Sequence, residues 1–177
     1  KILSSLKKNG IDFFTGVPDS VLKNFSHLLY NYNKKKHIIA ANEGGAVAIA
    51  VGYYLSSKKI PLVYLQNSGL GNIVNPITSM AHNKIYGIPM LLFIGWRGSP
   101  SIQDEIQHKV QGNITLKQLK LLNIKYEIFN KKTYTKQIKK LVNFSKARNQ
   151  PVAYLFRLND LNKDKIKINN CFINKMD

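Results

Sequence analysis

The chain has 177 residues, 44% of them hydrophobic, which is enough to bury the core of one domain. The chain has 27 Lys and Arg residues and nine Asp and Glu residues, which give a formal net charge of +18. A charge of this size is typical of proteins that bind nucleic acid. The basic residues are 24 Lys and only three Arg, and they are scattered without an aromatic–basic recognition motif. We therefore expect a solvated lysine surface and no nucleic-acid partner.

Other composition features exclude several further classes of protein. No run approaches the roughly 18 apolar residues of a membrane span, so we expect no membrane partner. The start of the chain lacks an apolar signal core, and it begins at Lys1 without methionine, as a trimmed chain or a piece of a longer one would. The single cysteine, Cys171, excludes an internal disulfide and a cysteine metal site, and we expect a cytoplasmic location.

Apolar runs alternate with helix-length amphipathic stretches along the chain. In the first half this pattern predicts strands at 11–17, 37–41, 61–66 and 89–95, with helices at about 19–32, 43–56 and 72–82. After a polar loop at 96–112 it predicts helices at 114–122 and about 134–147, and strands at 125–129 and 151–156. The alternation is typical of a three-layer α/β/α domain over 1–156, with a parallel sheet of about six strands. Residues 157–177 are predicted to form a polar tail or linker.

Four unusual motifs follow predicted strands. They are "GVPDS" at 16–20, "ANEGG" at 41–45, "QNSGLGN" at 66–72 and "GWRG" at 95–98. In open parallel sheets, ligands bind at the carboxyl ends of the strands. The sequence therefore predicts a ligand site where these four motifs meet.

Glu43 is the only acidic residue between Ser20 and Gln103. One interpretation is a carboxylate that stabilises the positive end of a helix by about 0.3–1 kcal/mol. However, the helix that it opens consists almost wholly of small apolar residues, which predicts burial and places Glu43 at a buried junction or an interface. A buried carboxylate needs a hydrogen-bond partner or takes up a proton. The alternative interpretation is therefore that Glu43 has a functional role.

The remaining motifs are ambiguous when each is considered alone. "QNSGLGN" could cradle a phosphate, but it lacks a third glycine and the lysine of a P-loop, and a tight turn capped by Asn72 explains it equally well. His108 is the one histidine of the long polar loop, whereas His27, His37 and His82 are expected to be structural or exposed. No spacing typical of a metal site is present, so we expect no metal held by the protein alone.

Considered together, these motifs resemble the pyrimidine-binding (PYR) domain of the thiamine-diphosphate-dependent decarboxylases. The resemblance covers about residues 12–130 and is most specific in "QNSGLGN", "GWRG" and "DEIQHKVQG". Within that family the chain is most similar to phosphonopyruvate decarboxylases, and sulfopyruvate decarboxylases share "QNSGLGN". The first group implies conversion of 3-phosphonopyruvate to phosphonoacetaldehyde and CO2 in phosphonate biosynthesis. The alternatives are the alpha subunit of a sulfopyruvate decarboxylase, or a non-catalytic basic binding module that retains the fold.

The resemblance also implies roles for individual residues. Glu43 would be catalytic, with its carboxylate hydrogen-bonded to N1′ of the aminopyrimidine of thiamine diphosphate. The cofactor would also be lined by Val17, Pro18, Asn67, Ser68, Gly69, Leu70 and Asn72. A small anionic 2-oxo acid would be bound by Asp19, Arg97, His108 and Lys109, and Asp19 could handle a proton.

The family binds the cofactor's diphosphate through Mg²⁺ with a GDG motif in a second domain. No GDG occurs in these 177 residues. The resemblance therefore implies half of an active site, completed by a second domain or subunit in a homo- or hetero-oligomer.

Overall fold

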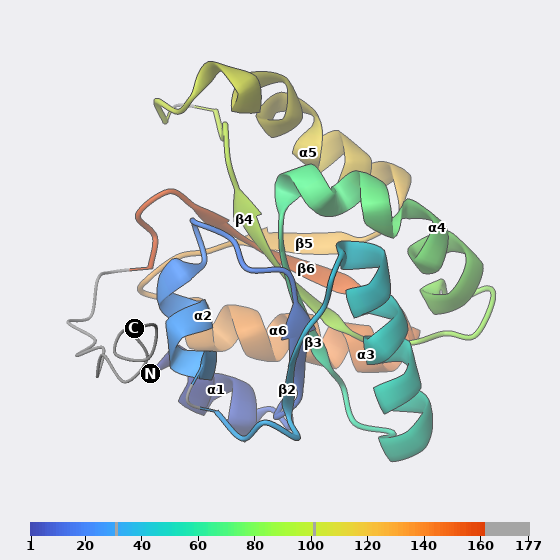
Figure 1. Ribbon diagram of the computed structural model, residues 1–177. Helices are drawn as coiled ribbons and strands as arrows, with labels where there is room; N and C mark the ends of the chain where they lie inside the picture. Colours follow the sequence, from blue (N-terminus) through green and yellow to red (C-terminus); the bar gives the residue numbers. More distant parts are fainter. Residues whose placement is uncertain (31, 101, 162–177) are drawn as a thin grey trace, which may run out of the picture.

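The computed structural model describes residues 1–30, 32–100 and 102–161, and it contains one sheet of six parallel strands (Figure 1). The strand order is β2-β1-β3-β4-β6-β5, and every neighbouring pair is parallel. This arrangement confirms the predicted fold class. The strands are β1 (Phe14–Gly16), β2 (His37–Ile39), β3 (Leu62–Gln66), β4 (Leu91–Trp96), β5 (Lys125–Ile128) and β6 (Val152–Arg157).

Helices cover both faces of this sheet. One face packs against α1 (Ile2–Lys8), α2 (Lys23–Tyr30) and α6 (Tyr134–Arg148), and the other against α3 (Glu43–Ser57), α4 (Val74–Pro76) and α5 (Lys109–Leu121). Leu62 and Tyr64 of β3 belong to the first core, whereas Val63 and Leu65 belong to the second, as the alternation of side chains along a strand requires. All four are fully buried, which explains why the central strands are continuously apolar.

Several predicted bounds were wrong. The predicted strands at 11–17 and 37–41 shorten to β1 and β2, and the short helix α1 was not predicted. The helix predicted at 72–82 is three short pieces: the 3₁₀-helix η1 (Asn67–Ile73), α4, and the π-helix η2 (Ile77–Ala81). Pro76 lies in the middle of this stretch and has no N–H to donate, which interrupts a regular α-helix.

The end of the predicted polar loop is also helical. The 3₁₀-helix η3 (Ile106–His108) leads directly into α5, which begins at Lys109 although its start was predicted at 114. The first turn of α5 exposes Lys109, Val110 and Asn113, so it lacks the apolar periodicity that marks a helix in a sequence.

The last strand ends close to its predicted position. Strand β6 extends to Arg157, whereas residues 162–177 of the predicted tail, including Cys171, lie outside the described residues. Within the described part of the chain, the helices are too short or too polar to cross a lipid bilayer.

Two helical glycines differ in what surrounds them, which gives a test of the packing. A Cβ on Gly52, in α3, would meet nothing within 4 Å, whereas one on Gly112, in α5, would lie 1.8 Å from the carbonyl oxygen of Gly98. We expect Gly52→Ala to raise the free energy of unfolding by about 0.5–1 kcal/mol, because alanine loses less backbone entropy in a helix. Gly112→Ala should instead lower it by about 1–3 kcal/mol through overpacking.

Urea denaturation of the two variants beside the unchanged chain measures both values. Equal effects of the two substitutions would contradict the packing of α5 against Gly98.

Candidate functional site

The four motifs lie at the carboxyl ends of neighbouring strands, as predicted. Gly16 of β1 pairs with Tyr64 of β3, and the backbone N–H of Val17 continues the pairing with a bond of 3.0 Å to the Tyr64 carbonyl. On the other side of β3, Gln66 pairs with Gly95 of β4, so "QNSGLGN" and "GWRG" begin side by side. Parallel pairing thus brings residues from four separate parts of the sequence to one edge of the sheet.

Glu43 is the first residue of α3 and is partly exposed at this edge. The preceding residue, Asn42, caps the helix by accepting a hydrogen bond of 2.8 Å from the N–H of Gly45. The Glu43 carboxylate accepts a hydrogen bond of 2.7 Å on Oε2 from Nδ2 of Asn72, in η1. Asn72 therefore orients the carboxylate instead of capping a helix.

Glycines allow this close approach of α3 to η1. A Cβ on Gly69 would lie 2.4 Å from Cδ and Oε1 of Glu43, and a Cβ on Gly44 would lie 2.9 Å from the carbonyl oxygen of Asn72. Any side chain at Gly69 would collide with the carboxylate. Gly69 of "QNSGLGN" thus leaves the space that the Glu43 side chain of "ANEGG" occupies. The sequence did not predict this contact.

Two of the residues predicted to line a cofactor point into the protein. Asn67 is fully buried: its Nδ2 donates to the Arg97 carbonyl and to Oγ1 of Thr115, both at 2.9 Å, and its Oδ1 accepts from the Arg97 N–H at 3.1 Å. Leu70 is also fully buried in the core. Asn67 thereby connects the ends of β3 and β4 with α5, and Ser68, Asn72 and Pro18 remain exposed at the edge.

Asp19 lies just beyond β1 and is only 8% exposed. Its Oδ2 accepts a hydrogen bond of 2.9 Å from the N–H of Leu22, whereas its Oδ1 has no partner in the described part of the chain. A Cβ on Gly95 would fall 1.9 Å from Oδ2, so this glycine leaves the space that Asp19 fills. Burial raises the pKa of the Asp19 carboxyl above its usual range, against the opposing effect of backbone hydrogen bonds.

Arg97 was predicted to bind substrate, and its side chain has an internal partner that the sequence did not reveal. Its guanidinium forms a two-point contact with Asp104, and its Nη1 donates to Oγ of Ser20 at 3.1 Å. The only signal in the sequence was an acidic residue seven positions after Arg97, which is insufficient to assign a pair. Ser20 and Arg97 bring the ends of β1 and β4 together beside Asp19.

His108 and Lys109 stand where the loop turns into α5. His108 is half-buried and Lys109 is exposed. The backbone there packs tightly, because a Cβ on Gly98 would lie 2.0 Å from the His108 carbonyl oxygen, and Gly98 has the left-handed φ of +63° that favours glycine. The Trp96 indole adds a hydrogen bond of 2.9 Å from Nε1 to the Gly112 carbonyl.

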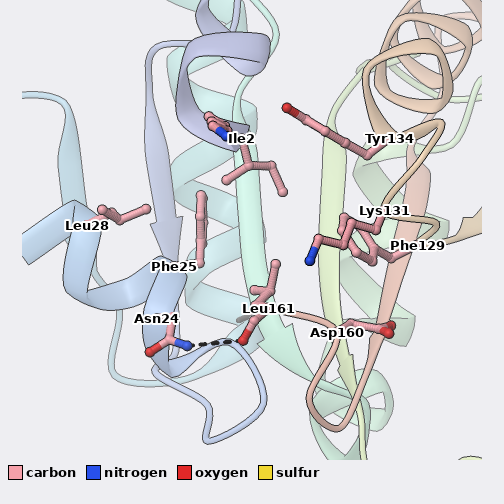
Figure 2. Close-up of a pocket in the computed structure, with 10 residues that line it drawn as sticks. Ile2, Asn24, Phe25, Leu28, Phe129, Lys131, Tyr134, Asp160 and Leu161 are labelled. Atoms are coloured by element: carbon pink, nitrogen blue, oxygen red, sulfur yellow. Dashed lines mark hydrogen bonds between the residues drawn. The ribbon is translucent and has the colours of Figure 1, made fainter. Parts of the chain in front are cut away.

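Two cavities in the described part of the chain lie away from these residues. One of about 320 Å³ lies between α1, α2 and the start of α6, with Phe25, Phe129 and Leu161 among the residues around it (Figure 2). A second, of about 440 Å³, lies among five lysines and Asp12 at the opposite edge of the sheet. None of the predicted site residues lines either cavity. Among residues 1–30, 32–100 and 102–161, no group of three or more His, Cys, Asp and Glu could hold a metal ion.

The burial of Asp19 has a consequence for stability as the pH changes. A carboxyl whose folded pKa is raised stabilises the fold while it is protonated, and this contribution is lost as the pH rises through the folded pKa. Asp19→Asn removes that loss, so we expect its stability relative to the unchanged chain to increase between about pH 4 and pH 7.

Asp12→Asn is the matched control. The Lys36 ammonium lowers the pKa of Asp12, so the slope should have the opposite sign and the variant should become relatively less stable as the pH rises. The slope for Asp12→Asn lies below about pH 4, because a lowered folded pKa changes stability only between that pKa and the unfolded one. Urea denaturation from about pH 2 to pH 7 measures both slopes. A flat difference for Asp19→Asn would show that its carboxyl is not perturbed by burial.

The sequence is similar to proteins of one known family. Residues 1–121 match the family described as "Thiamine pyrophosphate enzyme, N-terminal TPP binding domain". The chain is 32% identical over 127 residues to a phosphonopyruvate decarboxylase of Streptomyces viridochromogenes, an alignment that covers 72% of this chain and 31% of that protein. It is 34% identical over 158 residues to a sulfopyruvate decarboxylase subunit alpha of Methanococcus maripaludis, which covers 87% of this chain and 90% of that subunit. The chain thus spans about a third of the first relative and nearly all of the second.

Proposed function

Because this chain belongs to the thiamine pyrophosphate enzymes as their N-terminal TPP-binding domain, we propose that it supplies the pyrimidine-binding half of a 2-oxo acid decarboxylase. The substrate that we propose is 3-phosphonopyruvate, converted to phosphonoacetaldehyde and CO2 in phosphonate biosynthesis, in the cytoplasm. The similarity to phosphonopyruvate decarboxylases supports this choice. The sulfopyruvate decarboxylase subunits of similar length support sulfopyruvate as the alternative.

The position of the Glu43 carboxylate carries the proposal. It is partly exposed at the carboxyl edge of the sheet, oriented by Asn72 and packed over Gly69. A carboxylate with a fixed direction and one open side fits a ring nitrogen that must gain a proton. These residues therefore fit the aminopyrimidine of thiamine diphosphate.

Each residue then has a defined task. Bound thiamine diphosphate supplies the nucleophilic carbon and the electron sink for loss of CO2. Glu43 holds the proton at N1′ of the aminopyrimidine, and Val17, Pro18, Ser68, Gly69 and Asn72 form the wall around that ring. Asn67 and Leu70 shape the same wall from inside the protein. Asp19, kept protonated more readily by burial, can donate a proton to the reacting carbon.

The other half of the site would come from a second domain or a partner subunit that binds the diphosphate and Mg²⁺. The exposed side of α3 supports such an assembly, because Ala48, Gly52 and Leu55 face outward although the helix was predicted to be buried. Leu55 is 50% exposed, and Ile106 and Val110 are 78% and 72% exposed. The exposed apolar face of α3 is typical of a surface that a partner covers, and Ile106 and Val110 are exposed in a separate segment, η3 and the first turn of α5.

Glu43→Gln tests the central assignment in the complete enzyme. Glutamine has the size of glutamate and can still hydrogen-bond, but it cannot hold the proton at N1′. We expect kcat to fall by at least about a hundredfold, because acid–base contributions are typically 10²–10⁴-fold. The KM for the 2-oxo acid should change much less, since Glu43 contacts the cofactor.

Steady-state kinetics, exchange of the cofactor's C2 proton followed by NMR, and thermal melting together check this result. A carboxylate that serves only the helix end would instead cost about 0.3–1 kcal/mol of stability and leave turnover nearly normal. C2 exchange within a few-fold of the unchanged enzyme would refute the catalytic role.

The proposed division of the site gives a second expectation. This chain alone should bind thiamine diphosphate weakly or not at all in the presence of Mg²⁺, because the cofactor's diphosphate charge would lack its ligands. Adding the partner domain or subunit should restore tight binding. Calorimetric titration measures both states, and sub-micromolar binding to a monomer of this chain would disprove the division.

A further inference from the structure

Asp104 opens the motif "DEIQHKVQG", but the resemblance gives this residue no role. Its carboxylate accepts hydrogen bonds from Nε and Nη2 of Arg97, from the N–H of Gly98 at 2.7 Å and from the N–H of Glu105 at 2.8 Å. Its side chain is only 5% exposed, and the Arg97 guanidinium holds its pKa well below the usual range. Backbone groups on both sides of the loop thus fix the carboxylate in place.

The fixed carboxylate in turn fixes the guanidinium. Arginine has five N–H donors in a rigid plane. Asp104 takes Nε–H and one N–H of Nη2, and Ser20 Oγ takes one N–H of Nη1. Among the described residues this leaves two N–H groups of Arg97 for another acceptor, one on each terminal nitrogen. Ser20 is exposed at this edge of the sheet, and the Arg97 side chain is 16% exposed.

We propose that Asp104 is a positioning residue for anion recognition: it aims the free N–H groups of Arg97, beside the Ser20 hydroxyl, at the distal phosphonate or sulfonate of the substrate. This inference rests on the proposed function and deepens it. A planar guanidinium with two free N–H groups matches two oxygens of a tetrahedral anion, which a single lysine cannot do. Lys109, the exposed first residue of α5, has its backbone next to Gly98 and adds positive charge with a less fixed direction than a guanidinium.

Two other roles for Asp104 predict different results. If Asp104 only holds the loop together, its loss should affect every 2-oxo acid equally. If charge alone governs binding, removal of its negative charge should improve the binding of an anionic substrate. Only the positioning role predicts weaker binding that is confined to substrates with a distal anion.

The test uses the complex of this chain with its diphosphate-binding partner, and the substrates 3-phosphonopyruvate, sulfopyruvate and pyruvate. We expect Asp104→Asn to raise the KM for the substrate with a distal anion about tenfold, the scale of one charged hydrogen bond. Its kcat, and its KM for pyruvate, should stay within about twofold. Glu105→Gln is the matched control, because it removes the same charge one residue away without contacting Arg97.

Ser20→Ala provides a second variant that leaves the Arg97–Asp104 pair intact. Ser20 is exposed, so its hydroxyl can be removed without disturbing the core. We expect its KM for the anionic substrate to rise about threefold, again without a change for pyruvate. An unchanged or lower KM in Asp104→Asn, or an equal rise for pyruvate, overturns the positioning role.

A measurement without turnover separates this inference from the proposed function. In the ¹⁵N NMR spectrum of the full chain, the Arg97 Nε–H signal should shift on titration with methylphosphonate and not with acetate. Asp104→Asn should abolish the shift, and Glu105→Gln should keep it. No shift in the unchanged chain refutes the anion site, whereas a complex that decarboxylates no 2-oxo acid refutes the proposed function and leaves the NMR result standing.

Discussion

The contact of α3 with η1 is the constraint on which the candidate site depends. Glu43 can approach the chain after β3 only because Gly69 has no side chain, and the backbone at Gly44 passes close to the Asn72 carbonyl for the same reason. The hydrogen bond from Asn72 then gives the carboxylate one direction. The start of α3, the turn η1 and the Glu43 carboxylate therefore form a single unit, and a change in one of them requires a change in the others.

A second set of contacts ties this unit to β4 and α5. Buried Asn67 uses both ends of its amide to join Arg97 with Thr115, so the turn after β3 cannot move independently of β4. Buried polar groups of this kind are costly when unpaired, and complete pairing makes them specify one arrangement. Buried side chains such as Asn67 therefore hold the candidate site in shape without lying at its surface.

The sheet and the place of the site could be predicted from the sequence because apolar strand runs and their glycine-rich endings are local signals. The start of α5 could not, since Val110 and its neighbours are exposed and show no periodicity. The sequence predicts a loop for both Gly98 and Gly112, whereas in the structure each glycine makes room for the backbone of the other segment. Asp104 was missed because its pairing with Arg97 depends on how the loop folds back. Contacts between distant parts of the chain leave no pattern in one sequence.

The contact between Trp96 and Gly112 gives the protein a built-in optical reporter. Trp96 is the single tryptophan of the chain and is 3% exposed, with its indole N–H bonded to α5 and the Arg157 guanidinium 5.8 Å from its ring. All of the tryptophan emission therefore originates where β4, β6 and α5 meet, beside the candidate site. Separation of α5 from the sheet would hydrate this indole and move its emission to longer wavelengths. The docking of α5 can thus be followed in solution without attaching a dye.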